Sequence, residues 1–277
     1  MSGKTKIYTR FILIFLLSLV ATKLSGQWKI LQQGLQYAEF ESPQKSIAGD
    51  SKITVIKIDP NQYELKLFCA GEKDHGKLTA PEWCERYDLI GCINAGIFQT
   101  DQLSNVGYMK NFQYVNNPRI HQSYQSVTAF NPLDSTSKPF RIFDMDAYPM
   151  QSIINEYNTV IQNLRLIKYP GTNRWSQQKK MWSEAAMGED RDGHVLFIFS
   201  RSPYSMHDLN NIISKFPVGL VRAQHLEGGP EASLYFSCGD FHLMKTGSYE
   251  SGFNENDHNA HFWPIPNVVG ILKKNKM

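Results

Sequence analysis

The sequence is poor in the motifs that usually reveal a site. Its four cysteines, among 277 residues, include no Cys-x-x-Cys pair, the spacing typical of structural zinc sites and redox centres. It contains no HExxH motif, no phosphate-binding P-loop and no Gly-x-Ser-x-Gly nucleophile turn. It also has no Asn-x-Ser/Thr sequon. These absences exclude the zinc peptidases, P-loop enzymes and serine hydrolases that such motifs identify.

Long hydrophobic runs are also missing, with one exception near the start of the chain. Residues 11–21 form an apolar run of eleven, preceded by the basic residues Lys4, Lys6 and Arg10. This run is too short for a membrane-spanning helix, but its length and basic flank are typical of a secretory signal peptide. We therefore predict a signal peptide at residues 1–26 and a secreted or periplasmic protein with no integral membrane segment after its removal.

Little net charge remains once that segment is set aside. Residues 1–26 carry four basic and no acidic side chains, so the formal charge falls from +3 to −1 without them. A nearly neutral protein has no overall field to attract a polyanion. The composition therefore excludes nucleic acid as an expected partner.

Residues 27–277 contain no linker, charge block or repeat that would divide them, and we predict a single domain. The even number of cysteines in an exported chain predicts at least one disulfide, with three possible pairings. The alternative is that some are buried thiols, above all Cys69 and Cys92, which lie in apolar, strand-like runs.

Short runs of strand-forming residues, several alternating apolar with polar, outnumber the helical patterns. The predicted strands are 53–59, 63–70, 89–98, 126–130, 140–146, 194–200, 220–226, 232–236 and 267–272. The predicted helices are 80–87, 153–164 and 206–216, the last beginning at Ser205 with Asp208 as a capping box. This order predicts an α+β fold with a mixed, largely antiparallel sheet packed by a few helices.

The first candidate site is the segment HLEGGPEASLYF at residues 225–236, which places Glu227 and Glu231 on either side of a Gly-Gly pair. Gly228 and Gly229 allow positive φ angles and a close approach of a ligand to the backbone. Their N–H groups can form a small anion-binding nest. The alternative is a solvent-exposed bend with two hydrated glutamates.

The second candidate is INAGIFQTD at residues 93–101, where an apolar strand opens into polar residues. Asn94 offers an amide donor and acceptor suited to a sugar hydroxyl, Gly96 keeps the strand end open, and Phe98 can form an apolar platform on the way to Asp101. The alternative is local turn chemistry, with Asn94 bonded to backbone and Phe98 in the core.

Ordered blocks of the sequence resemble the phosphodiester glycosidase family. The blocks are INAGIF, NVGY, AAMGED with RDGHVLFIF, LEGGPEASLY and the closing IPNVVGIL, and the similarity covers roughly residues 50–272. The resemblance implies an exported hydrolase that acts on a sugar joined through a phosphodiester, on an α+β fold with a mixed sheet. Its Leu-Asp-Gly-Gly block falls on residues 226–229, so Glu227 stands where the family usually has Asp. Its Asn-Gly-Gly-Phe-like block falls on residues 94–98.

Two departures from the family pattern concern charge. Glu184 and Ala185 stand where the family commonly has an Arg-Thr pair, and Pro230 and Glu231 interrupt its glycine-rich run. A cation expected to bind an anion has thus become an acid. The substrate is then a sugar without phosphate, or the lost positive charge is supplied from elsewhere in the chain. The candidates for that charge are Arg201, His207, Arg222 and His225.

The expected chemistry follows from the bond. An oxocarbenium-like transition state needs a carboxylate nearby, and we assign Glu227 to it, as base or as nucleophile. A phosphodiester leaves as a stable anion, whereas an ordinary alcohol must be protonated. The second acid is Glu231, Glu184 or Asp101, and in the ordinary-glycoside case Glu184 and Glu231 serve as acids with raised pKa.

Three alternatives stay open. Ligand-type residues gather near the C-terminus, but their spacing matches no named metal site, so we predict no cofactor and leave a divalent metal as an unsupported possibility. These residues are Asp240, His242, Asp257, His258 and His261. A carbohydrate-binding protein without turnover is the main rival to an enzyme, and a structural envelope protein is the third hypothesis. Phe262 or Trp263 is a candidate sugar platform, or a core residue.

Overall fold

The computed structural model describes residues 28–73 and 76–274, so the predicted signal peptide lies outside the described residues. Three sheets organise the chain, and every pairing between their strands is antiparallel. The predicted, largely antiparallel pairing is confirmed, but the strands form three sheets rather than one mixed sheet. The fold is rich in strands with few helices, so α+β describes it only approximately.

The large sheet has eight strands and carries most of the candidate site. In spatial order its strands are β1 (Lys29–Gln32), β2 (Leu35–Glu41), β3 (Lys52–Ile58), β14 (Val195–Tyr204), β13 (Trp182–Asp190), β15 (Leu220–Gly228), β11 (Arg165–Lys168) and β12 (Thr172–Asn173). The central strands β13 and β14 are almost wholly buried, as expected of strands covered on both faces.

The other two sheets have five strands each. The distal sheet consists of β7 (Tyr114–Asn117), β6 (Met109–Asn111), β10 (Tyr157–Asn163), β8 (Ser126–Pro132) and β9 (Phe140–Asp144). The C-terminal sheet consists of β17 (Phe241–Thr246), β16 (Ser233–Cys238), β5 (Gly91–Asn94), β18 (Asn267–Lys273) and β4 (Tyr63–Cys69). Apolar residues from all three sheets form one continuous core.

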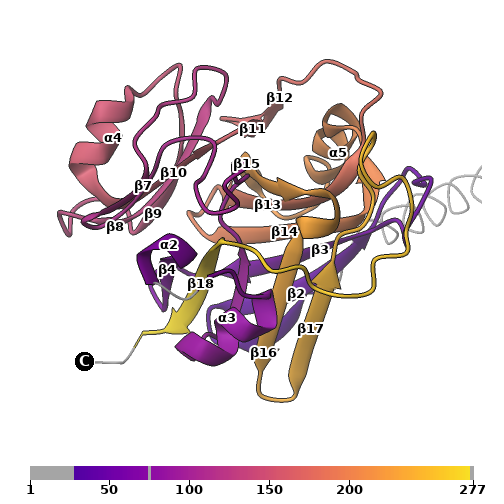
Figure 1. Ribbon diagram of the computed structural model, residues 1–277, viewed down its shortest axis with the longest axis horizontal. Helices are drawn as coiled ribbons and strands as arrows, with labels where there is room; N and C mark the ends of the chain where they lie inside the picture. Colours follow the sequence, from indigo (N-terminus) through magenta and orange to yellow (C-terminus); the bar gives the residue numbers. More distant parts are fainter. Residues whose placement is uncertain (1–27, 74–75, 275–277) are drawn as a thin grey trace, which may run out of the picture.

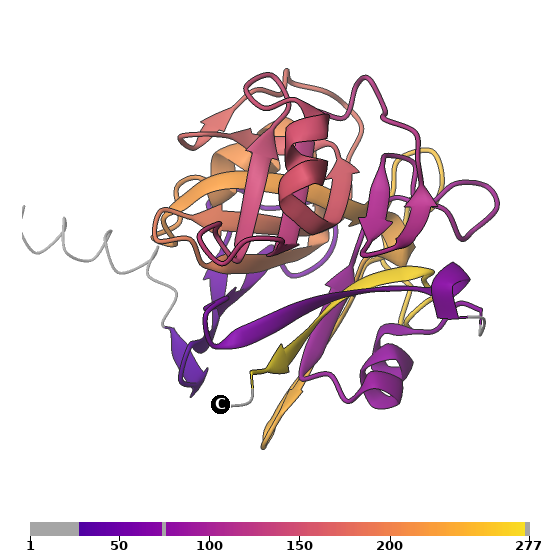
Figure 2. The same cartoon turned by 90° about the vertical axis from the view of Figure 1, so that its left-hand side faces the viewer.

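Helices cover the outer faces of the sheets. They are α2 (Ala70–Lys73), α3 (Ala80–Tyr87), α4 (Met150–Glu156) and α5 (Met206–Ile213), with a 3₁₀ turn, η1, at Gly229–Glu231. Helix α4 lies on the side of the distal sheet that faces away from the rest of the molecule (Figures 1 and 2). Helix α5 packs on the large sheet, and α3 packs with the C-terminal sheet.

Local sequence signals explain two of these helices. Thr79 caps α3 in a reciprocal capping box with Glu82, and the helix occupies the predicted residues 80–87. Ser205 accepts a hydrogen bond from the Asp208 amide at 3.1 Å, as predicted for the start of α5. Within residues 28–73 and 76–274, no helix is long and apolar enough to cross a membrane.

The predicted helix at residues 153–164 is wrong in its second half. Helix α4 ends at Glu156 and the chain continues directly as β10. Thr159, Val160 and Ile161 lie in this strand, and their branched side chains favour an extended backbone. Pairing with β6 and β8 on both sides completes the strand's hydrogen bonds.

The expected disulfide is not present, because all four cysteines are free. Cys69 contacts the Met109 sulfur at 3.9 Å, and the Cys92 thiol donates to the Ala80 carbonyl at 3.4 Å. Both are fully buried, so the alternative of core thiols holds for these two.

The path of the chain between two sheets creates the candidate site. Strand β15 ends at Gly228 in the large sheet, η1 turns the chain, and β16 begins at Ser233 in the C-terminal sheet. A register shift between Ala185 and Ala186 in the β13–β15 pairing marks a bulge just before this crossing. Such a bulge redirects side chains at a strand end.

Candidate active site

Four glutamates gather where the chain crosses between the sheets, and we call them the carboxylate cluster. Glu184 comes from β13, Glu227 from the end of β15, Glu231 from η1, and Glu250 from the loop after β17. Glu227 is under electrostatic repulsion from the other three, so each of them lies within reach of its charge. Strand pairing aligns Glu184 with Gly228.

Glu227 is the buried centre of the cluster. Its Oε1 atom accepts a hydrogen bond from the Gly228 amide at 3.0 Å, while its buried Oε2 atom has no hydrogen-bond partner among the described residues. Burial raises its pKa well above the usual value, and repulsion from Glu231, Glu250 and Glu184 adds to the shift against the opposing Gly228 hydrogen bond. These effects favour the protonated form of Glu227 relative to an exposed glutamate.

Glu184 is held on both oxygens by its neighbours. Nδ1 of His225 lies 2.7 Å from its Oε1, and the Trp182 indole donates to its Oε2 at 2.7 Å. Burial raises the pKa of Glu184, while His225 and the hydrogen bond from Trp182 act against that shift. Glu184 is thus part of a buried, satisfied network.

Glu231 is half-buried, and Asn94 fixes the turn that carries it. The Asn94 side chain donates to the Glu231 carbonyl at 3.0 Å and accepts from the Ser233 amide at 2.7 Å. Burial, with repulsion from Glu250, raises the pKa of Glu231 to about 6. The structure therefore brings Asn94 to the site, with its amide bonded to the backbone as the turn alternative predicted.

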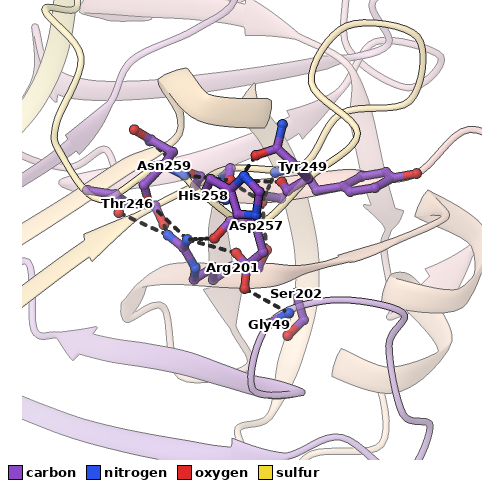
Figure 3. A network of polar contacts seen from close by, with 12 residues as sticks. Gly49, Arg201, Ser202, Thr246, Tyr249, Asp257, His258 and Asn259 are labelled. Atoms are coloured by element: carbon purple, nitrogen blue, oxygen red, sulfur yellow. Dashed lines mark hydrogen bonds and ion pairs between the residues drawn. The ribbon is translucent and has the colours of Figure 1, made fainter.

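Glu250 was not predicted from the sequence, and Arg201 holds the loop that carries it (Figure 3). The Arg201 guanidinium donates to the carbonyls of Thr246 (2.8 Å), Asp257 (3.0 Å) and Asn259 (2.9 Å), and it forms an ion pair with the Asp257 carboxylate at 2.7 Å. Its donors are therefore engaged in the fold. Burial raises the pKa of Glu250, against the opposing attraction of His225 and Lys180.

The two glycines of the turn are required by packing. A Cβ at Gly228 would lie 2.7 Å from the Trp182 ring, and one at Gly229 would lie 2.4 Å from Oε2 of Glu250. Gly229 also has a φ of +63°, which favours glycine. The Gly228 N–H is taken by Glu227, so only the Gly229 amide stays available for the predicted anion nest.

The remaining residues of the second candidate segment lie in structural turns. Gly96 packs against Asn105, whose Oδ1 would be 2.3 Å from an added Cβ. Phe98 is partly buried and forms a backbone bridge with Asn105. Asp101 is exposed and accepts hydrogen bonds from the amides of Leu103 and Ser104. A hydrogen bond from the Ser104 side chain contributes most to lowering the pKa of Asp101, and the two amides add to this effect. No contact with the carboxylate cluster is recorded for these three within the described chain.

The other predicted cationic residues are also engaged elsewhere. His207 on α5 contacts the Trp175 carbonyl at 2.6 Å and the Asn211 amide at 2.9 Å. Arg222 is buried and forms an ion pair with Glu189 at 3.3 Å. Among the four candidates for the lost positive charge, only His225 contacts the cluster directly.

The ligand-type residues near the C-terminus do not converge. His242 contacts the Ser237 hydroxyl at 3.1 Å, Asp257 pairs with Arg201, and His261 stacks on Trp263 with ring centroids 6.4 Å apart. Among described residues, metal-type geometry occurs only in a different group, Asp190, Asp192 and His194. A Lys57 ammonium 3.0 Å from the Asp190 carboxylate already supplies a positive charge there.

Tyr124, like Glu250, is a residue near Glu227 that the sequence did not indicate. It precedes β8 of the distal sheet, and interaction with the Glu227 charge adds to the effect of burial in raising its pKa. Its backbone carbonyl accepts from the Gln162 side chain at 2.8 Å. Residues in or next to all three sheets therefore lie near the candidate site, which explains why no single sequence segment contains it.

Comparison with known proteins is consistent with this arrangement. The family model of phosphodiester glycosidases matches residues 87–272, so the chain belongs to the phosphodiester glycosidase family. This family of hydrolases supports a glycosidase-like function. No curated protein sequence gives a significant match.

Two solved structures share the fold at low sequence identity. One is the catalytic domain of zebrafish N-acetylglucosamine-1-phosphodiester alpha-N-acetylglucosaminidase, auto-inhibited by its pro-peptide. It is 12% identical with a TM-score of 0.61, and the match covers 90% of this chain and 88% of that one. The other is a hypothetical protein from Synechocystis, also 12% identical with a TM-score of 0.61, covering 90% of this chain and 64% of that one.

Proposed function

We propose that this protein is an exported glycosidase that uses the carboxylate cluster for acid–base hydrolysis of a glycosidic bond. The observation that carries the proposal is the difference in pKa between two carboxyl groups of the cluster. Burial and repulsion raise the pKa of Glu227 well above its usual value and favour its protonated form, whereas Glu231, with a pKa of about 6, is mostly ionised at pH 7. Two carboxyl groups held in opposite protonation states are what glycoside hydrolysis requires.

In this scheme Glu227 is the general acid, which exchanges the roles of Glu227 and Glu231 expected from the sequence. Its Oε2, buried and without a partner among the described residues, donates a proton to the oxygen of the leaving group. The Glu231 carboxylate stabilises positive charge on the sugar and serves as base or nucleophile for the second half of the reaction. Asn94 holds the backbone of Glu231 in place.

The charge balance of the cluster favours an ordinary glycoside over a sugar phosphodiester. Glu184 occupies the position of the family's cation, and no arginine hydrogen-bonds to any of the four glutamates in the described part of the chain. A phosphodiester leaving group needs cationic stabilisation more than a proton. The protonated Glu227 instead suits an alcohol that must be protonated as it leaves.

Hydrolysis assays on two substrate panels test the proposal. One panel holds 4-nitrophenyl glycosides of common sugars in both anomers, and the other holds the matching sugar-1-phosphodiesters. We expect turnover on at least one glycoside, little on the phosphodiesters, and loss of turnover in Glu227→Gln with unchanged activity in the partly exposed control Glu64→Gln. Equal loss in both variants, or activity confined to phosphodiesters, would contradict the proposed assignment.

A carbohydrate-binding protein without turnover is the second candidate. It is favoured by the burial of Glu184 and Glu227, which are 0% and 8% exposed and leave little room for water to attack. Sugar binding by the unaltered protein, with no hydrolysis on either panel, is the result that selects this function.

Export is part of the proposal and has its own test. The basic n-region and apolar run at residues 1–26 support it. We expect the mature protein, isolated from outside the cytoplasm, to begin near residue 27 by N-terminal sequencing. A cytoplasmic protein with an intact N-terminus would contradict export without affecting the proposed chemistry.

A further inference from the structure

A polar cavity lies at the opposite end of β15 from the carboxylate cluster. It has a volume of about 430 Å³ and lies where β9 and the turn after it meet β11, β13 and β15 of the large sheet. Arg222 lines it, five residues along the strand from Glu227. At the usual rise of a strand this is roughly 16 Å away. The cavity is therefore separate from the proposed active site.

The lining of this cavity is rich in positive charge. Its five cationic residues are Lys138, Arg141, Lys168, Arg191 and Arg222, and its three acidic residues are Asp144, Glu189 and Asp190. Lys57, outside the lining, pairs with Asp190 at 3.0 Å. Glu189 accepts a hydrogen bond from the Ile142 amide at 2.9 Å. Two of the acids are thus partly compensated by groups that do not line the cavity, and so is one of the cations, because Lys168 pairs with Asp146.

The third acid is also held by its surroundings. Asp144 accepts from the Tyr169 amide at 3.2 Å and pairs with Arg165 at 3.4 Å. In contrast, Lys138 and Arg191 are exposed and form no ion pair within the described residues. The cavity therefore presents uncompensated positive charge on a protein whose predicted mature form is nearly neutral.

Aromatic rings lie beside these cations. The Arg222 guanidinium lies 4.3 Å from the centre of the Tyr169 ring, which is 53% exposed. Arg141 lies 5.1 Å from the Tyr148 ring and donates to the Tyr148 hydroxyl at 3.0 Å. An exposed aromatic ring beside cationic side chains suits a ligand with an apolar sugar face and an anionic group.

We infer that this cavity binds the anionic group of an acidic saccharide. Lys138, Arg141 and Arg191 surround the anion, and Tyr169 contacts the sugar ring. A phosphate, sulfate or carboxylate substituent meets the same charge requirement. The choice of a saccharide rests on the proposed function, whereas the choice of an anion rests on the lining alone.

Calorimetric titration of the whole protein tests the inference with three probes, glucose 6-phosphate, glucose and inorganic phosphate. We expect glucose 6-phosphate to bind and glucose not to bind. The double variant K138A/R191A should weaken glucose 6-phosphate binding at least tenfold. The matched control K45A/K215A removes the same charge from exposed positions outside the cavity and should leave the affinity unchanged.

Other variants assign the sugar contact and the location. Tyr169→Ala should weaken glucose 6-phosphate binding more than inorganic phosphate binding, and equal affinities for both probes in the unaltered protein would overturn the saccharide assignment. Unchanged binding in K138A/R191A would overturn the site itself. Loss of binding in E227Q would place the ligand in the proposed active site and also overturn the inference. Hydrolysis of a neutral glycoside by K138A/R191A separates this result from failure of the proposed function.

Discussion

Nδ1 of His225 lies 2.7 Å from Oε1 of Glu184, and both side chains are almost completely buried on neighbouring strands of the large sheet. The Trp182 indole donates to the other Glu184 oxygen. A buried acid with two polar partners stabilises the fold only while both partners are present, because an unpaired polar group in the interior is strongly unfavourable. Glu184 is therefore structurally committed in this chain.

Removing one side of this contact should be more harmful than removing both. We expect Glu184→Ala to lower the free energy of unfolding by about 3–5 kcal/mol, because it leaves His225 and Trp182 without their acceptor. The paired change E184L/H225F should lose less than the sum of the single variants. Urea unfolding at pH 7 measures both, with the partly exposed control Glu64→Ala expected to stay within about 0.5 kcal/mol. Additive effects would contradict the coupling.

The raised pKa of Glu231 has a predictable effect on stability. Its folded pKa of about 6 exceeds the ordinary 4.5, so the folded state binds this proton more tightly than the unfolded state. The resulting stabilisation is complete below pH 4.5 and is lost as the pH rises through about 6. We expect the free energy of unfolding to fall by about 1 kcal/mol over this window, after allowing for screening of the partly exposed group.

Urea unfolding across pH 4–8 measures this dependence. The variant Glu231→Gln should show a flatter profile because it cannot titrate, while Glu64→Gln should follow the unaltered protein. A profile in Glu231→Gln as steep as that of the unaltered protein would place the titration on another group.

Gly229 should be needed for the position of Glu250 as well as for its own backbone angle. Gly229→Ala places a Cβ 2.4 Å from Oε2 of Glu250 at a φ of +63°, whereas Gly239→Ala has a φ of +58° and open space around its Cβ. Both should lose roughly 1–2 kcal/mol of stability from backbone strain. Only Gly229→Ala should also reduce the rate of hydrolysis. A misplaced group that raises the activation free energy by roughly 1.4 kcal/mol lowers the rate by about tenfold. Equal activity of the two variants would separate Glu250 from the chemistry.

Arg201 should act on the site through the loop that carries Glu250. Lysine keeps the charge but lacks the planar fork that reaches Thr246, Asp257 and Asn259 together. We expect Arg201→Lys to speed amide hydrogen exchange over residues 247–259, with no such change in the exposed control Arg119→Lys. Unchanged amide hydrogen exchange in this loop would mean that its other contacts suffice to hold it.

The sequence predicted much of the fold because strand patterns and helix caps are local. The capping box at Thr79 and Glu82 and the cap at Ser205 fix the starts of two helices within four residues. The segment at 153–164 misled because its apolar spacing fits a helix, whereas pairing with β6 and β8 selects a strand. The number of sheets depends on long-range pairing, which no local pattern contains.

The candidate site was predictable only in part, because only some of its residues lie close together in the sequence. Glu227 and Glu231 lie in one short segment, and the resemblance to the family directed attention to Glu184. Glu250 lies in a turn without a local signal, and only the folding of the loop after β17 brings it to Gly229. The roles assigned to these residues in catalysis stay predictions.

The most direct test of the central claim is the protonation state of Glu227 itself. Carbon-13 NMR of protein labelled at the glutamate carboxyl groups follows each titration from pH 4 to 9. The buried cluster predicts one carboxyl signal that titrates well above the usual glutamate range and disappears in Glu227→Gln, with a second titrating near pH 6 and absent in Glu231→Gln. Ionisation of every glutamate below pH 5 would contradict the account, because no proton would remain to donate to a leaving group.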